Sequence, residues 1–257
     1  MNGRRAYTHW VAWGVTGLAL LLLALLIQAP AALLPWLTDR LAPDGLRWRG
    51  VSGTLWQGQA EAVYWQTQTS VQPLGRLSWR WRAADLASAR LAWKLALSGA
   101  GSDLDAELSR SLDAWHLRQA RGQLSANVLG GLWPAMRLIH PQGRLELAAE
   151  DFRIGRDGMG GEMRLDWRAA VSALVTAPLG EYRLRLTAGE GGLDLNLDTL
   201  QGPLQAQGQG RWRPGEGMSL SVEIRPPTTN RADYAPALDL LARADAEGTY
   251  RLIWSAQ

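Results

Sequence analysis

The 257-residue sequence contains no cysteine. No disulfide framework can therefore hold the fold together, and neither a thiolate nucleophile nor a cysteine-based metal site is available. This absence agrees with a bacterial periplasmic protein but does not by itself assign a compartment.

Lysine is almost absent too, because Lys94 is the only lysine among 27 basic residues, and the net charge is only +3. The bias towards Ala, Arg, Gly and Leu is typical of a GC-rich genome, so the arginines do not indicate phosphate binding. Tryptophans and arginines alternate at 79–82 and 211–213, as in some single-strand nucleic-acid grooves. Alternation in a strand puts rings and guanidiniums on opposite faces, so we expect no nucleic-acid partner.

Charge is missing from one long N-terminal stretch. Between Ala6 and Thr38 there is no Asp, Glu, Lys or Arg, and residues 10–28 are almost wholly apolar. A bilayer core needs about 20 apolar residues in a helix, because only a helix satisfies its own backbone hydrogen bonds in lipid. We therefore predict an uncleaved transmembrane helix over residues 10–29, with anchoring side chains that include Trp10, Trp13, Leu21 and Leu26.

The flanking charges predict the orientation of this helix. Arg4 and Arg5 precede it, whereas the first charge after it is Asp39, so the positive-inside rule keeps the N-terminus cytoplasmic. The alternative is a signal peptide cleaved near residues 29–31, although its apolar core usually has about 7 to 15 residues. The expected organisation is a cytoplasmic segment 1–9, a transmembrane helix 10–29, a periplasmic linker 30–49 and a periplasmic β domain 50–257.

Beyond Gly45, apolar residues recur at every second position in many short runs, which indicates strands. In one of them Leu77, Trp79 and Trp81 share a face, and Arg80 takes the other. Further runs cover residues 91–97, 145–147, 163–167, 182–186, 193–197, 204–212, 218–224 and 250–254.

Glycine and proline clusters separate these runs, at 99–101, 155–161, 189–192, 202–203 and 214–217. Helical periodicity is confined to residues 235–244, 109–117 and a short piece around 129–139. The pattern predicts a mainly β protein, in which the transmembrane helix is followed by an antiparallel, curved sheet or a sandwich-like domain with a few short helices. Spacing does not distinguish the open sheet from the sandwich.

Four regions carry a resemblance to a known family. Residues 50–60 read GVSGTLWQGQA, and an LSWRW run then leads into LASARLAWKLALSG. RGQLSANVL follows at 121–129, and LLARADAEGTYRLIWS lies at 240–255. In this order the motifs resemble the type II secretion system protein N family, with Glu247-Gly248 where that family has an Asp-Gly type of turn.

The resemblance implies a single-pass inner-membrane protein that is accessory to the export of folded proteins across the outer membrane. It implies no catalytic residues and no cofactor. The implied partners are other type II secretion components, either the secretin or the inner-membrane platform.

The residues that could act in catalysis or bind a metal ion are isolated from one another in the sequence. His116 and His140 have no matching base or ligand set beside them in the sequence, and Ser52 lacks the GxSxG spacing of a nucleophile elbow. Asp194 begins a calcium-like pattern that fails at the later ligand positions, and Asp103 invites the same comparison with the same result. We expect a protein that is not an enzyme and binds no metal.

Tryptophans on the expected apolar face are the remaining candidates, because an indole combines a large apolar ring with an N–H that needs a partner. Two functions stay open. The first is a secretion scaffold that recruits partners by strand addition or through a flat polar face. The second is an AsmA-like periplasmic lipid-handling protein whose open apolar groove holds acyl chains. The core or interaction residues in question are Trp56, Trp79, Trp81 and Trp93.

Overall fold

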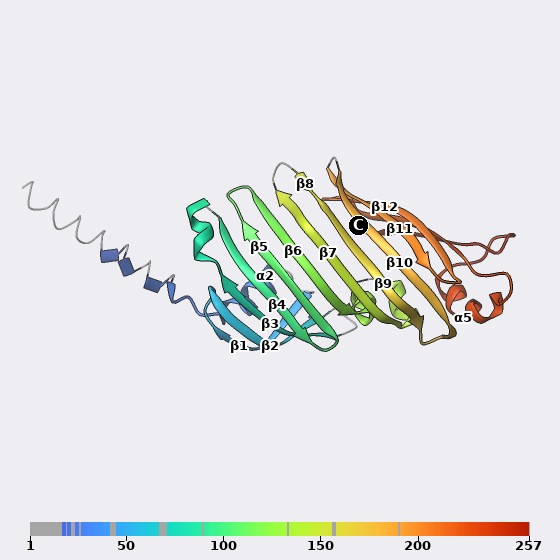
Figure 1. Cartoon of the computed structure of the whole chain (residues 1–257), viewed down its shortest axis with the longest axis horizontal. Coiled ribbons are helices and arrows are strands. Elements are labelled where there is room, and N and C mark those ends of the chain that lie inside the picture. Colours follow the sequence, from blue (N-terminus) through green and yellow to red (C-terminus); the bar gives the residue numbers. More distant parts are fainter. Residues whose placement is uncertain are drawn as a thin grey trace, which may run out of the picture.

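Each strand of this protein pairs antiparallel with the next main strand along the chain, as short alternating runs joined by turns predict. The computed structural model describes residues 17–256, apart from 19, 22–23, 26, 42–44, 67–70, 89, 133, 156–157 and 190. These residues form a 14-stranded sheet that starts at β1 and finishes at β14 (Figure 1). Only the short strand β8 lies off this path, paired with β7.

The strands of the first half are β1 (Gly45–Gly53), β2 (Gln57–Gln66), β3 (Val71–Trp81), β4 (Leu91–Gly99), β5 (Ser102–Arg110) and β6 (Ala114–Ser125). Those of the second half are β7 (Pro141–Gly155), β8 (Gly158–Gly160), β9 (Glu162–Ser172), β10 (Val175–Gly189), β11 (Gly192–Gln201), β12 (Gln205–Arg213), β13 (Gly217–Arg225) and β14 (Tyr250–Ala256). The expected mainly antiparallel β class is confirmed. The molecule takes the open, curved form of that class and not the sandwich.

Among the described residues, short helices and 3-10 turns lie at four points along the sheet. Helix α2 (Leu33–Leu41) precedes β1, and a 3-10 turn, η1 (Ala83–Ser88), follows β3. A 3-10 turn η2 (Ala126–Val128) with helices α3 (Leu129–Leu132) and α4 (Pro134–Ile139) connects β6 to β7, and α5 (Arg231–Leu241) precedes β14. The segment expected as a linker, 30–49, therefore contains α2 and the first residues of β1.

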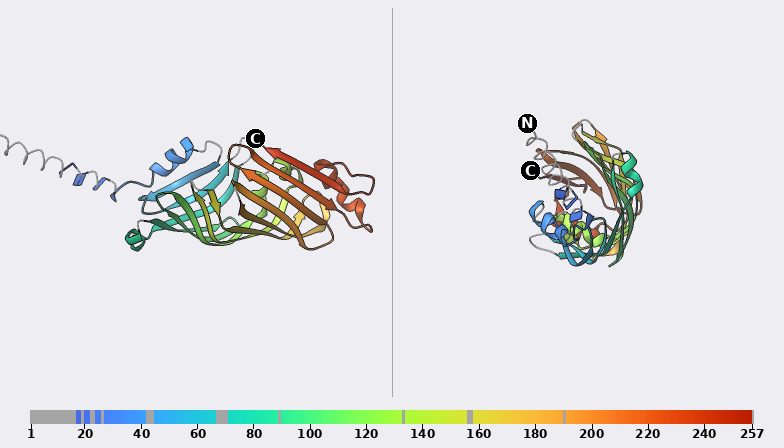
Figure 2. Two further views of the ribbon diagram at one scale, coloured as in Figure 1. Left: turned by 90° about the horizontal axis from the view of Figure 1, so that it is seen from above. Right: turned by 90° about the vertical axis from the view of Figure 1, so that its left-hand side faces the viewer.

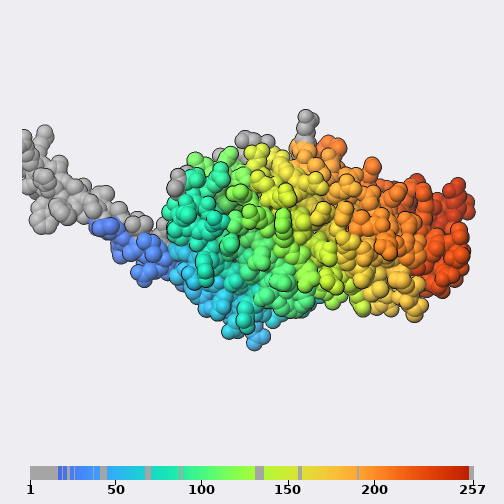
Figure 3. Space-filling view, viewed as in Figure 1, coloured from blue at the N-terminus to red at the C-terminus, as the bar shows by residue number. Residues whose placement is uncertain are grey.

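The sheet bends into a trough, and Figure 2 shows its curved cross-section with the helices between β6 and β7 inside the curve. Side chains along each strand alternate between the two faces of the sheet, and the apolar ones lie on the inner face. Trp79 lies opposite Leu95, and Leu145 lies opposite Trp167, which in turn lies opposite Tyr182. The outer face carries ion pairs between neighbouring strands, such as Arg183–Asp166 and Arg185–Asp198. Figure 3 shows the molecule from one side as a continuous surface.

Bulges bend the strands, because an extra residue in one strand increases the local twist. One register shift lies between Gln142 and Arg144, where β7 pairs with β9. Gly143 at this point has a φ of +108°, and a Cβ there would lie 2.5 Å from the backbone oxygen of Ala169. Only glycine permits this close approach of the two strands.

The helix expected over 109–117 is wrong, because this segment forms the end of β5, a turn and the start of β6. The Ser111 hydroxyl donates to Asp113 Oδ1 (2.8 Å) and accepts from the Ala114 backbone N–H (3.2 Å), which fixes the turn. Leu112, which gave the segment its helical period, is 89% exposed at the tip. Pairing along two neighbouring strands outweighs this weak local preference. Helical structure does occur in the other two expected segments.

Trp79 organises the core at the N-terminal end of the trough. Its side chain is 5% exposed, and its indole N–H donates to the backbone oxygen of Thr54 (3.0 Å). Trp48 meets it edge to face, with ring centroids 6.2 Å apart. Gly58 lies opposite Trp79 on β2, and a Cβ at Gly58 would come within 2.5 Å of the indole ring.

A buried carboxylate organises the outer face. Asp166 on β9 is 3% exposed and receives two hydrogen bonds from Arg183 on β10 (2.7 and 2.8 Å) and one from Arg168 (3.1 Å). Arg168 also pairs with Glu181 (2.6 Å) and Glu146 (3.2 Å), so the network joins β7, β9 and β10. The hydrogen bonds from Arg183 hold the pKa of Asp166 below its ordinary value, against the opposing effect of burial.

Replacing Trp79 by Ala is expected to lower the free energy of unfolding by about 3–5 kcal/mol, because it leaves a cavity and an unpaired Thr54 carbonyl. Trp115→Ala is the matched control, since Trp115 is 44% exposed, and should cost less than about 1 kcal/mol. Denaturant unfolding of the purified full chain measures both. Similar losses for the two variants would contradict this assignment of the core.

Asp166 should make stability depend on acid pH. Because its folded-state pKa lies below that of the unfolded chain, ionised Asp166 stabilises the fold above about pH 4 and loses this effect as the pH falls through the folded pKa. The difference in unfolding midpoint between wild type and Asp166→Asn should therefore shrink as the pH is lowered from neutral. The exposed Asp103→Asn serves as control. A difference that stays constant with pH would contradict this role.

Candidate functional site

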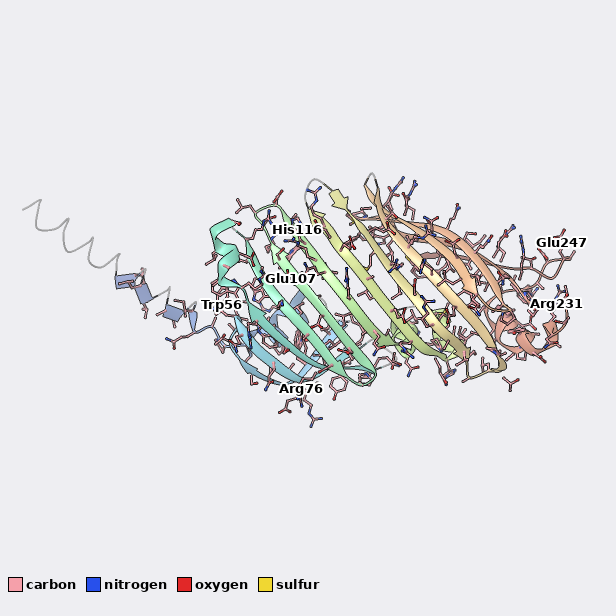
Figure 4. The ribbon with its side chains drawn as sticks, viewed as in Figure 1. Trp56, Arg76, Glu107, His116, Arg231 and Glu247 are labelled. Atoms are coloured by element: carbon pink, nitrogen blue, oxygen red, sulfur yellow. The ribbon has the colours of Figure 1, made fainter. Side chains whose placement is uncertain are left out.

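Three of the four tryptophans expected as core or interaction residues form one contact cluster at the N-terminal end, with the fourth, Trp79, beside them. Trp81 on β3 lies opposite Trp93 on β4. Trp56 packs on both, with ring centroids 5.1 Å from Trp81 and 6.4 Å from Trp93. All three are half-buried, and Figure 4 places Trp56 at the end of the sheet nearest the N-terminal segment.

The turn between β1 and β2 connects this cluster to the segment before the sheet. The Trp93 indole donates to the backbone oxygen of Leu55 (3.2 Å), as Trp79 does to that of Thr54. On its other side the turn binds residues 29–31, because the Leu55 N–H donates to the oxygen of Ala29 (2.9 Å) and the Ala31 N–H donates to that of Gly53 (3.0 Å). Two indoles thus fix the point at which the N-terminal segment joins the sheet.

An apolar groove of about 450 Å³ occupies the inner face at the other end of the trough, between β7 and β9–β14 on one side and α3–α5 on the other. Several leucines that line it stay half-buried although they point to the inside of the curve. Contiguous apolar surface of this kind marks a binding site more often than an ordinary surface does. The half-buried lining includes Leu165, Leu184, Leu197, Leu220 and Leu252.

Three polar side chains in the wall of this groove form hydrogen bonds within the fold. The Ser172 hydroxyl donates to the backbone oxygen of Ile139 (2.6 Å), and the Trp167 indole donates to that of Gln142 (2.9 Å). The Tyr182 hydroxyl lies 2.9 Å from the oxygen of Leu179 and 3.0 Å from that of Leu204. Burial raises the pKa of Tyr182 well above its ordinary value, so the phenol stays neutral.

The two edges of the sheet differ. Helix α2 covers the β1 edge, where the Trp48 indole donates to the Thr38 hydroxyl (3.0 Å) and Arg47 pairs with Asp39. Residues 29–31 cover the end of the same edge. β14 pairs with β13 along one edge. Along its other edge, among the residues that the structure describes, the only pairing is one bridge between Ala244 and Tyr250.

The polar candidates for catalysis lie apart from one another. Ser52 is on β1, His116 is on β6 with its Nδ1 3.5 Å from Asp151, and His140 follows α4. Asp194 pairs with Arg211 across β11 and β12 (2.7 Å). Within the described part of the chain no group of three His, Asp or Glu side chains could hold a metal ion. Figure 4 shows His116 on β6 and Glu107 on the neighbouring strand β5.

Most of the expected anchor falls outside the described residues, including Trp10, Trp13 and Leu26. Leu21 itself is helical and 57% exposed. None of the helices in the described ranges is both long enough and apolar enough to span a bilayer.

The sequence left an open apolar groove as one of two alternatives, and it did not indicate that the two edges differ. Alternation identified the leucines of the groove, but it could not show where the sheet curves or that these leucines stay half-buried. A signal for the open edge was present in the last strand, where Leu252, Ile253 and Trp254 follow one another without a proline or lysine that would block strand addition.

Comparison with known proteins assigns the chain to a family. Residues 44–253 match the family described as Type II secretion system (T2SS), protein N. The chain is also 26% identical over 196 residues to "Type II secretion system protein N" of Vibrio cholerae serotype O1, an alignment that covers 75% of this chain and 74% of that relative. No solved structure matches the chain. Because the family match spans most of the sequence and nearly all of the curved sheet, the chain belongs to the protein N family of the type II secretion system.

Proposed function

We propose that this protein is a non-catalytic scaffold of the type II secretion system, held in the inner membrane by residues 10–28 with its β domain in the periplasm. Family membership supports a role in the secretion apparatus. The charge-free stretch after Arg4 and Arg5 supports the anchor and its orientation. The partners are other secretion components, at the secretin or at the inner-membrane platform.

The open edge of β14 carries this proposal, because it offers a ready site for strand addition. The backbone N–H and C=O groups along the free edge of β14 can hydrogen-bond to an extended segment of a partner. Ile253, which is 78% exposed, lies where the side chains of the added strand would contact it. At the opposite end α2 and residues 29–31 cover the β1 edge, so within the described part of the chain the sheet presents one such site and not two.

The distribution of ionisable groups supports a role without catalysis. Acid–base or nucleophilic chemistry needs several groups that converge on one point. Here Asp166, Asp194 and Asp198 each pair with arginines on neighbouring strands. Glu107 on β5 pairs with Arg82, which follows β3. These ion pairs stabilise the sheet. His116 and His140 lie on different elements, and neither lies beside Ser52.

A scaffold acts by its location, so the anchor should be essential. The test exports residues 29–257 behind a cleavable signal peptide and measures secretion of a substrate in a strain that lacks the native gene. The exported domain is expected to accumulate in the periplasm without restoring secretion, whereas the full chain restores it. Full secretion with the unanchored domain would remove the scaffold proposal.

Strand addition predicts that residue 253 contacts a partner. A photoactivatable amino acid at position 253 should yield adducts with another secretion component in native membranes, whereas the same probe at Arg49, on the covered β1 edge, should not. Ile253→Lys should lower the adduct yield at a second β14 position, 251, by about tenfold, the equivalent of about 1.4 kcal/mol. The matched control is Val71→Lys, at an interior strand and 57% exposed. Equal yields from both edges would contradict the proposal.

A further inference from the structure

The groove on the inner face offers an occupant apolar contacts and few hydrogen bonds. Its wall consists of Leu, Ile, Val, Ala and Met side chains together with aromatic rings. The polar atoms of Ser172, Trp167 and Tyr182 are already bonded to backbone oxygens. A peptide would bring an N–H and a C=O from every residue into this wall and leave them without partners, which is costly. A hydrocarbon chain has no such groups, so it suits the groove better than a peptide does.

The size of the groove also suits a chain of this kind. Its volume of about 450 Å³ lies within the range of small-molecule sites, which is about 300–1,000 Å³. Helix α5, which covers one side of the groove, is held to the sheet by two hydrogen bonds. The Tyr234 hydroxyl donates to the Pro178 oxygen (3.2 Å), and the Tyr250 hydroxyl donates to Asp239 (3.0 Å). The groove is therefore formed before an occupant arrives, and binding need not order the helix.

Among the described residues that line the groove, one cation has no ion-pair partner. Arg243, just after α5, is exposed and lines the groove, and no carboxylate among the described residues forms an ion pair with it. Arg251 also lines the groove, but its guanidinium pairs with Glu223 (2.6 Å) on the outer face. An apolar groove with one unpaired guanidinium at its mouth matches a molecule with a hydrocarbon tail and an anionic head.

We propose that this groove holds an acyl chain of a phospholipid, with the phosphate against Arg243. The proposal goes beyond the scaffold role and does not depend on any partner. Hydrophobic burial of the chain supplies the affinity, and the guanidinium selects the anionic head group.

The test uses the full chain, reconstituted into vesicles of equimolar phosphatidylethanolamine and phosphatidylglycerol that contain a trace of phosphatidylglycerol with a diazirine in one acyl chain. After irradiation, the label should map to groove residues of β9–β14 and α5. Leu220→Asp should reduce this labelling about tenfold, because a carboxylate then faces the chain. Ser221→Asp is the matched control, since Ser221 is the next residue of β13, points to the outer face and is exposed; its labelling should equal that of wild type.

Arg243→Gln keeps the test decisive if Leu220→Asp fails to fold, because Arg243 is exposed. It should reduce labelling by the phospholipid probe several-fold and leave labelling by a neutral diacylglycerol probe unchanged, whereas Arg90→Gln, at an exposed arginine near the other end, should change neither. A wild-type groove without label, or labelling that is equal in wild type and a folded Leu220→Asp, would overturn the proposal. So would equal loss of both probes in Arg243→Gln. Because the vesicles contain no other secretion component, the result is independent of whether the scaffold role holds.

Discussion

The hydrogen-bond ladder between each strand and its successor holds this molecule together, and most other features follow from it. A single sheet built in this way has two faces and two edges, and it must protect its apolar face from water. The protein does so by bending the sheet around its own side chains and by placing α3, α4 and α5 inside the curve. The outer face needs no cover, because paired arginines and carboxylates occupy it.

The two ends of the trough have different chemistry. At the N-terminal end, tryptophans fill the curve, and their indole N–H groups hold the turn that joins the preceding segment. At the C-terminal end, leucines line a curve that the short helices cover only in part. Apolar clusters connect the ends, since Leu74 packs on both the N-terminal and a central cluster, and Trp167 packs on both the central and the C-terminal one. A change at one end can therefore reach the other through packed side chains.

Period-two alternation was a reliable guide to strands, because it records which side chains share a face. It located the runs around Trp79, Leu95, Leu165 and Leu184 on the apolar face, where the structure has them. It failed at 109–117, where Leu112 and its neighbours gave a helical period although the backbone forms a hairpin. This segment belongs to the β5–β6 hairpin, in which β5 pairs with β4 and β6 pairs with β7. Those pairings outweigh the local spacing of apolar residues.

The positions of the bends and the protection of the edges could not be predicted, since they depend on backbone geometry that side-chain patterns do not record. Gly143 lies within β7 where two strands approach closely, and it belongs to none of the glycine and proline clusters found in the sequence. In the sequence, Asp166 looks like any other polar residue of a strand. The structure shows that it is a buried carboxylate, because Arg183 lies opposite it on β10 and Arg168 donates a hydrogen bond to it. The anchor and the secretion role came from composition and from the resemblance, not from strand patterns.

The order of the strands also bears on how the chain folds. Because nearly every pairing joins neighbours in the sequence, the sheet can be assembled one hairpin at a time from one end of the chain to the other, and no strand has to wait for a distant partner. Each unfinished sheet exposes its latest strand, which is the state most open to wrong pairing. The edge that β14 presents in the finished protein is the same kind of surface that every earlier strand presented before its neighbour arrived.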